Sequence, residues 1–127
     1  MHWAETYVGD PYVPGEHDCG AFAARVMREQ FGREVHLPSA RGHGLRDDSR
    51  QINRLLDDFG EPVDTPAESD AVVMVSRGML SHVGIYCEIN GEAHVVHAMK
   101  NAGQVCLHKL RQLEHLGLRI EGYYRWR

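Results

Sequence analysis

One cysteine in this sequence lies where a helix could activate its thiol. Asp18 is a good helix N-cap, and Cys19, directly after it, begins an apolar-periodic segment over residues 19–31. The dipole and the free N–H groups at a helix N-terminus favour the thiolate that attacks a carbonyl, and they can also hold the oxyanion of acyl transfer. We therefore predict that Cys19 is a nucleophile with a lowered pKa. The alternative is a buried structural thiol on the apolar stripe of the helix.

A predicted hairpin could supply the base that such a nucleophile needs. Asn90-Gly91, between strand-like segments over 82–89 and 92–99, is typical of a two-residue turn, in which the residues flanking the turn pair with each other. Paired residues share a face of the sheet, and the faces alternate along each strand. This register predicts one face that carries His82, Gly84, Tyr86, Val95 and His97.

On that face the two histidines are diagonal neighbours, roughly 7–8 Å apart at the backbone and within reach through their rings. This suits a base, His82, oriented by a second polar group, His97, with Gly84 leaving room for the cysteine helix. His94 falls on the opposite face, beside Cys87. A three-residue loop would shift the register and bring His94 to the His82 face instead.

The elements that must position these residues follow an α+β order, with helices first and an antiparallel sheet after them. Gly32 closes the cysteine helix, the segment up to residue 48 is predicted to be a loop, and Gly60, Pro62 and Pro66 mark a connection. The predicted helices cover 3–8, 19–31, 49–59 and one or two turns over 110–116, and the predicted strands cover 71–75, 82–89, 92–99, 104–107 and 118–126.

Composition is typical of one globular domain over residues 1–127, with 43% hydrophobic and 25% charged residues. A net charge of −4 without a Lys/Arg block counts against nucleic-acid binding and against attraction to anionic surfaces. No segment is apolar enough to span a membrane, and the N-terminus does not read as a secretory signal. Three cysteines without metal-type pairing indicate reduced thiols.

Zinc binding is the main alternative for these residue types, since His17-x-Cys19 and His94-x-x-His97 could form a ligand set. The predicted hairpin separates His94 and His97 onto opposite faces, which counts against a shared metal. Cys87 and Cys106 are predicted to be thiols of the core. The histidines predicted to be exposed or incidental are His2, His17, His36, His43, His108 and His115.

Five short motifs, taken in order, resemble the NlpC/p-sixty family of papain-like cell-wall cysteine peptidases. The resemblance covers nearly the whole chain. Each motif alone is weak, but the five motifs in this order are specific to the family. The motifs are Pro11-Tyr12 with Gly15, Asp18-Cys19-Gly20-Ala21-Phe22, Ser69-Asp70-Ala71-Val72-Val73-Met74, His82-Val83-Gly84-Ile85-Tyr86 and Val96-His97-Ala98.

The resemblance implies a papain-like fold in which the nucleophile lies at a helix N-terminus packed on an antiparallel sheet. It implies Cys19 as nucleophile, His82 as general base and His97 as the orienting residue, without a metal or cofactor. The substrate-binding residues that it implies are Tyr12, Asp18 and Gly20, the last standing where the family has a serine.

Members of this family hydrolyse peptide-stem bonds of peptidoglycan, typically between D-glutamate and diaminopimelate. A bare domain without an export signal or wall-anchoring module resembles the versions carried by tailed phages. The expected protein is then synthesised in the cytoplasm and associates with the virion tail, with stem peptides and phage tail proteins as partners. Two alternatives are an amidase of a related papain-like class and a catalytically silent tail-assembly or interaction module.

Overall fold

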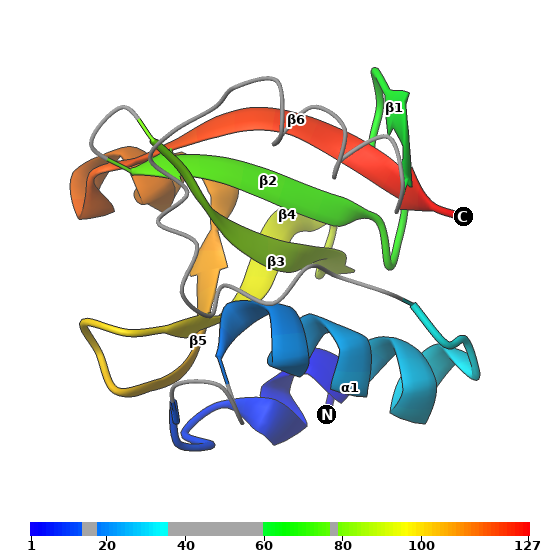
Figure 1. The fold of residues 1–127 in the computed structure, drawn as a ribbon, viewed down its shortest axis with the longest axis horizontal. Helices are drawn as coiled ribbons and strands as arrows, with labels where there is room; N and C mark the ends of the chain where they lie inside the picture. Colours follow the sequence, from blue (N-terminus) through cyan, green and yellow to red (C-terminus); the bar gives the residue numbers. More distant parts are fainter. Residues whose placement is uncertain (14–17, 36–59, 77–78) are drawn as a thin grey trace.

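The computed structural model describes residues 1–13, 18–35, 60–76 and 79–127. Within these ranges the chain forms helical segments and a six-stranded antiparallel sheet with the strand order β1-β6-β2-β3-β4-β5 (Figure 1). The predicted mixture of helix and antiparallel sheet is confirmed. The elements are η1 (Trp3–Tyr7), α1 (Cys19–Phe31), β1 (Gly60–Val63), β2 (Ala71–Ser76), β3 (Met79–Ile89), β4 (Glu92–Met99), β5 (Gln104–Lys109), η2 (Leu110–Leu116) and β6 (Leu118–Trp126), where η denotes a 3₁₀ helix.

The long helix α1 begins and ends where its capping residues predict. Asp18 has an extended backbone, and its Oδ1 accepts a hydrogen bond of 2.8 Å from the Ala21 N–H. Gly32 adopts the left-handed conformation that ends many helices, with φ 64°. Cys19 is therefore the first residue of α1, as predicted.

The β3–β4 hairpin has the predicted register. Asn90 and Gly91 both have positive φ, 54° and 77°, as a type I′ turn requires, and Ile89 pairs with Glu92. The pairing continues to Ile85 opposite Val96. The asparagine and the glycine tolerate this backbone better than other residues do, which explains why the local sequence sets the register.

The two faces of the sheet are covered by different helices. Helix α1 packs against β3 and β4 on one face, whereas η2 contacts β4, β5 and β6. Figure 1 shows α1 lying along one side of the curved sheet. The buried residues form two clusters, one that includes Val26, Met27 and Ile85 and one that includes Tyr86 and Leu113.

Three segments differ from the sequence-based prediction, and one prediction falls outside the described residues. Residues 60–63 form a strand, β1, rather than a connection; it lies at the sheet edge and, among the described strands, pairs only with β6, where a proline such as Pro62 is tolerated. Strand β3 begins at Met79, three residues before its predicted start, and β5 extends to Lys109, two residues beyond its predicted end. The helix predicted over 49–59 lies outside the described residues.

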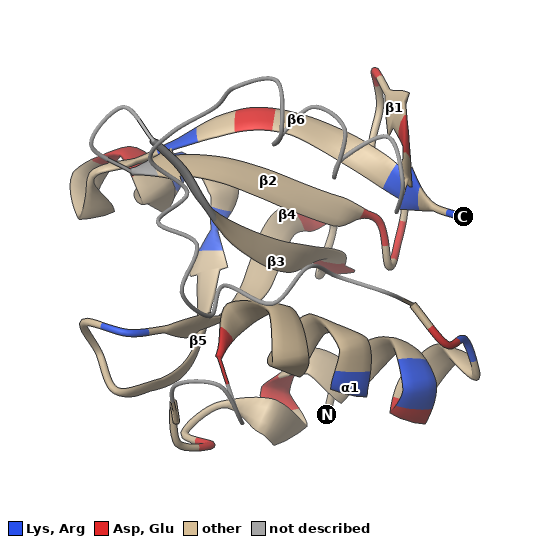
Figure 2. Cartoon of the chain, viewed as in Figure 1, with Lys and Arg blue, Asp and Glu red and all other residues tan. Residues whose placement is uncertain are grey.

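Positively and negatively charged residues are interspersed along the described elements, including α1 and β6 (Figure 2). Among the described helices, none has the length and apolar character needed to cross a membrane. Cys87 is fully buried, as predicted for a core thiol, whereas Cys106 is half-buried.

Candidate active site

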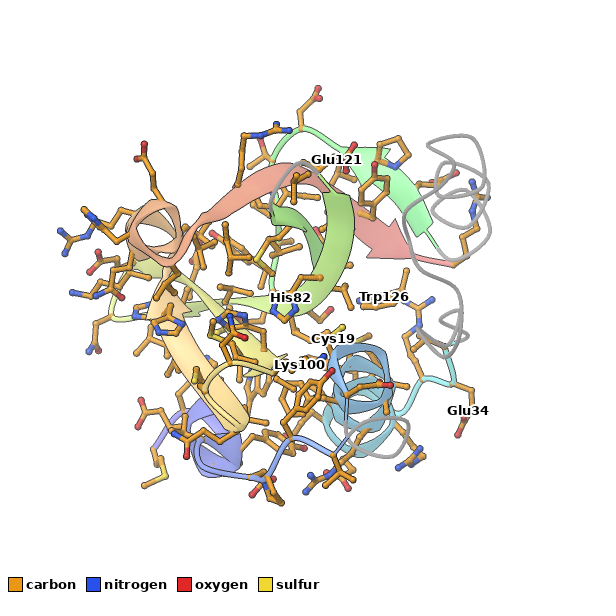
Figure 3. The ribbon with its side chains drawn as sticks, turned by 60° about the vertical axis from the view of Figure 1, so that its left-hand side comes forward. Cys19, Glu34, His82, Lys100, Glu121 and Trp126 are labelled. Atoms are coloured by element: carbon orange, nitrogen blue, oxygen red, sulfur yellow. The ribbon has the colours of Figure 1, made fainter. Side chains whose placement is uncertain are left out.

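The Cys19 thiol, at the N-terminus of α1, is surrounded by backbone donors. Backbone N–H groups of Val83, of Gly20 and of Cys19 itself interact with the sulfur and lower the pKa of the thiol, because they favour its charged form. Because Val83 follows His82 on β3, this contact places the helix N-terminus beside the histidine. Figure 3 shows Cys19 at the end of α1 next to β3, with His82 alongside.

The Val83 N–H is available to the sulfur because β3 and β4 separate at this point. The Tyr86 N–H donates to the Asp70 carbonyl, on the β2 side of β3. N–H groups alternate between the two edges of a strand, so the Val83 N–H points to the β4 side. The β3–β4 ladder ends at the pair of Ile85 and Val96, and the Cys19 sulfur therefore takes a donor that the next ladder bond would otherwise use.

His82 and His97 are joined as the hairpin register predicts. The His82 Nε2 atom lies 2.6 Å from the His97 Nδ1 atom, and the two ring centroids are 4.9 Å apart. His97 has no exposed surface. His94 lies opposite Cys87, and its Nδ1 atom hydrogen-bonds to the Glu92 carbonyl instead. The geometry therefore joins His97, and not His94, to His82.

Gly84 makes room for strand β4 and not, as predicted, for the cysteine helix. A Cβ atom at this position would lie 2.4 Å from Val95 Cγ2 and 3.0 Å from His97 Cβ. The first distance is too short for a real side chain and the second is tighter than most real contacts, and no helix atom is among the three nearest neighbours. The glycine thus lets the strand that carries His97 approach β3 closely.

A third histidine extends the pair, and the prediction that His108 is incidental is wrong. The His97 Nε2 atom lies 2.9 Å from the His108 Nδ1 atom. His108 pairs with Val95 in the β4–β5 ladder and is a diagonal neighbour of His97 on the same face. The pairing rule that joined His82 to His97 finds His108 only once the length of the connection before β5 is known, and the local sequence does not fix that length.

Burial keeps all four titratable side chains of this site neutral. It lowers the pKa of His82 to about 4, lowers the pKa of His97 well below its ordinary value, and lowers the pKa of His108. Burial also raises the pKa of the Cys19 thiol, outweighing the backbone N–H groups that lower it. The lowered thiol pKa predicted from the sequence is therefore wrong, and the resting pair is a neutral thiol with a neutral imidazole.

Alkylation of Cys19 should show this neutral pair directly. Because the folded environment raises the pKa of the thiol above its ordinary value of 9.0, the fraction of thiolate falls, and we expect the iodoacetamide reaction of Cys19 to rise with pH with a midpoint at or above pH 9. Mass spectrometry of digested samples separates Cys19 from Cys87 and Cys106. A midpoint well below pH 8 at Cys19 would instead indicate a thiolate–imidazolium ion pair.

Within the described residues, Cys19 and His82 are not joined by a hydrogen bond. The Nδ1 atom of His82 also has no other hydrogen-bond partner among these residues. This nitrogen is not fully enclosed, since every fully buried side-chain nitrogen and oxygen in the described residues has a partner. Catalytic hydrogen bonds often tighten only when substrate binds. The Nδ1 atom is thus the free position at which His82 could accept a proton.

The three residues predicted to bind substrate lie around the nucleophile. Burial raises the pKa of Tyr12, and the neighbouring Cys19 and Asp18 raise it further, which places the phenol within electrostatic reach of the thiol. The Tyr12 N–H donates to the Gly103 carbonyl at 2.9 Å and holds this segment against the turn before β5. Asp18 is buried as the cap of α1, and Gly20 directs its N–H at the sulfur. Substrate binding by these residues stays a prediction.

In the part of the chain that the structure describes, no group of three or more histidine, cysteine, aspartate and glutamate side chains could hold a metal ion. His94 and His97, adjacent ligands in the zinc alternative, lie three residues apart on β4 and therefore face opposite sides of the sheet. His17 lies outside the described residues.

No protein-family model matches the sequence. A search of curated proteins also finds no significant match.

Proposed function

We propose that this protein is a papain-like cysteine hydrolase of the NlpC/p-sixty type that cleaves peptide-stem bonds of bacterial peptidoglycan. One observation carries the proposal: the first residue of a helix, Cys19, places its sulfur against the backbone N–H of the residue after His82, while the His82 ring is hydrogen-bonded to buried His97. A nucleophile, a base and a group that orients the base are the parts that covalent acyl transfer needs.

The chemistry begins from the neutral pair. The free Nδ1 atom of His82 takes the thiol proton as the sulfur attacks the carbonyl carbon of the scissile amide. In this proposal the N–H groups at the start of α1, which interact with the sulfur, stabilise the oxyanion. The imidazolium then protonates the leaving amine, and a water molecule, activated by the same ring, hydrolyses the thioester to release the acid and the free thiol.

The choice of peptidoglycan rests on the ordered motifs from Pro11-Tyr12 to Val96-His97-Ala98. In this proposal the scissile bond links D-glutamate to diaminopimelate. The enzyme acts as a tail-associated hydrolase of a phage, with phage tail proteins as its partners.

Digestion of purified peptidoglycan tests this proposal. We expect mass spectrometry to detect soluble peptides that begin with diaminopimelate, with the two residues Ala-Glu left on the glycan. Release of whole stems with their N-terminal alanine would identify the amidase alternative. If the folded protein releases no fragment from peptidoglycans that differ in their stem peptides, the result would support the alternative of a catalytically silent interaction module.

A further inference from the structure

His82, His97 and His108 form a continuous row of imidazoles, which we call the histidine row. Its two hydrogen bonds join Nε2 of one ring to Nδ1 of the next, at 2.6 Å and 2.9 Å. The three residues come from β3, β4 and β5, and each contact is diagonal between neighbouring strands. The row begins beside the Cys19 thiol and ends at His108, which is half-buried.

The central ring, His97, restricts how the protons of the row can be arranged. A neutral imidazole has one N–H and one lone pair, so His97, with a partner at each nitrogen, donates in one bond and accepts in the other. Its complete burial excludes the charged form, which would donate in both. The two hydrogen bonds of the row therefore run in the same direction.

Either direction fixes the tautomer of His82. If the protons point from His82 towards His108, the His82 Nε2 atom carries the proton and its Nδ1 atom presents a lone pair. If they point the other way, Nδ1 carries the proton. The Cys19 thiol beside this ring is protonated, since burial outweighs the backbone N–H groups that favour its charged form, so it has its own proton to donate to a neighbour. A lone pair on Nδ1 complements that donor, whereas a second N–H would oppose it.

We propose that His108 is a positioning residue that accepts the His97 Nε2 proton and thereby holds His82, through His97, in the tautomer with a free lone pair on Nδ1. The catalytic part of this inference rests on the proposed hydrolase function; the tautomer itself does not. The role requires an acceptor where the His108 Nδ1 atom lies, 2.9 Å from His97.

Two substitutions of His108 with side chains of similar size distinguish the role of a hydrogen-bond acceptor from that of side-chain volume. His108→Asn can place its amide oxygen near the position of the Nδ1 atom, whereas His108→Leu has the same branch without an acceptor. His115→Leu serves as the control, because His115 is exposed on η2 and takes no part in the histidine row. Circular dichroism and thermal melting show which variants are folded.

The direct readout is the ¹⁵N NMR spectrum of the histidine rings, which distinguishes the two tautomers. We expect Nε2–H tautomers for His82, His97 and His108 in the wild type and in His115→Leu. In His108→Leu we expect a mixture of tautomers at His82, and a kcat lowered about tenfold to a hundredfold with little change in KM. His108→Asn should restore the wild-type tautomer and most of kcat.

An Nδ1–H tautomer of His82 in the wild type would overturn the inference, as would a folded His108→Leu with unchanged tautomers and kcat. If His108→Leu does not fold, His108→Asn provides the test. Loss of the Nε2–H tautomer of His82 in folded His108→Asn would also overturn the inference. A protein that shows the expected tautomers but hydrolyses no wall peptide would overturn the proposed function and leave the positioning role of His108 intact.

Discussion

Cys19→Ala should abolish the release of stem peptides from purified peptidoglycan, with a fall in rate of more than about a thousandfold. Alanine has no nucleophilic atom at this position, so the thioester intermediate cannot form. The Cys19 residue as a whole is not fully buried, and the cap formed by Asp18 and Ala21 does not involve its sulfur, so the variant should fold normally. Mass spectrometry of the soluble fragments measures the rate, and thermal melting reports the fold.

Cys106→Ala is the matched control: Cys106 is a half-buried thiol of β5 that pairs with His97 across the β4–β5 ladder, but its sulfur donates to the Gln104 carbonyl and not to a histidine of the row. We expect its activity to remain within about twofold of the wild type, because alanine keeps this backbone pairing and removes no hydrogen bond of the row. Glycan strands should stay intact with every variant. Release of reducing sugars by the wild type, or a folded Cys19→Ala that still cleaves stems, would refute the cysteine mechanism.

The second large effect concerns the two histidines of β4. We expect His97→Ala to lower kcat by about a hundredfold or more, because His82 loses the ring that orients its Nε2 atom. His94→Ala should change kcat little. Among the described residues its ring bonds only to the nearby Glu92 carbonyl, and losing that bond should lower the free energy of unfolding by about 1 kcal/mol.

Since His97 is fully buried, alanine also leaves a cavity, and the loss of activity must be separated from a loss of stability. His97→Asn makes this separation, because an amide oxygen near the position of Nδ1 can still accept from His82. We expect it to recover part of the lost kcat. Activity that survives in folded His97→Ala and disappears in His94→Ala would make His94 the orienting residue.

The hairpin that carries these residues was predictable because its information is local. Asn90 and Gly91 accept the positive φ of a type I′ turn, which fixes the pairing of the residues beside them. From that pairing the diagonal contact between His82 and His97 follows by counting. The start of α1 was equally predictable, because the Asp18 carboxylate bonds to an N–H only three residues away.

His108 was missed because the register of β5 depends less on its own turn. Residues 100–103 form a longer connection, of which only Gly103 has a positive φ, and the strand is also held by the Pro11 bridge and by the bond between the Tyr12 N–H and the Gly103 carbonyl. These partners are about ninety residues distant in sequence. No local pattern therefore announces that β5 brings a third imidazole to His97.

What the sequence by itself determined is the cap of α1, the first helical position of Cys19, and the register that pairs His82 with His97. Each depends on hydrogen bonds and backbone angles within a few residues. The tertiary structure alone decided that the helix N-terminus meets β3 where β4 leaves it, that burial raises the pKa of the Cys19 thiol, and that His108 completes the row. Burial and contacts between distant strands depend on how separate segments pack. The pKa of the Cys19 thiol can therefore be raised, where the helix N-terminus alone predicts that it is lowered, although the local predictions of the helix cap and the hairpin register are correct.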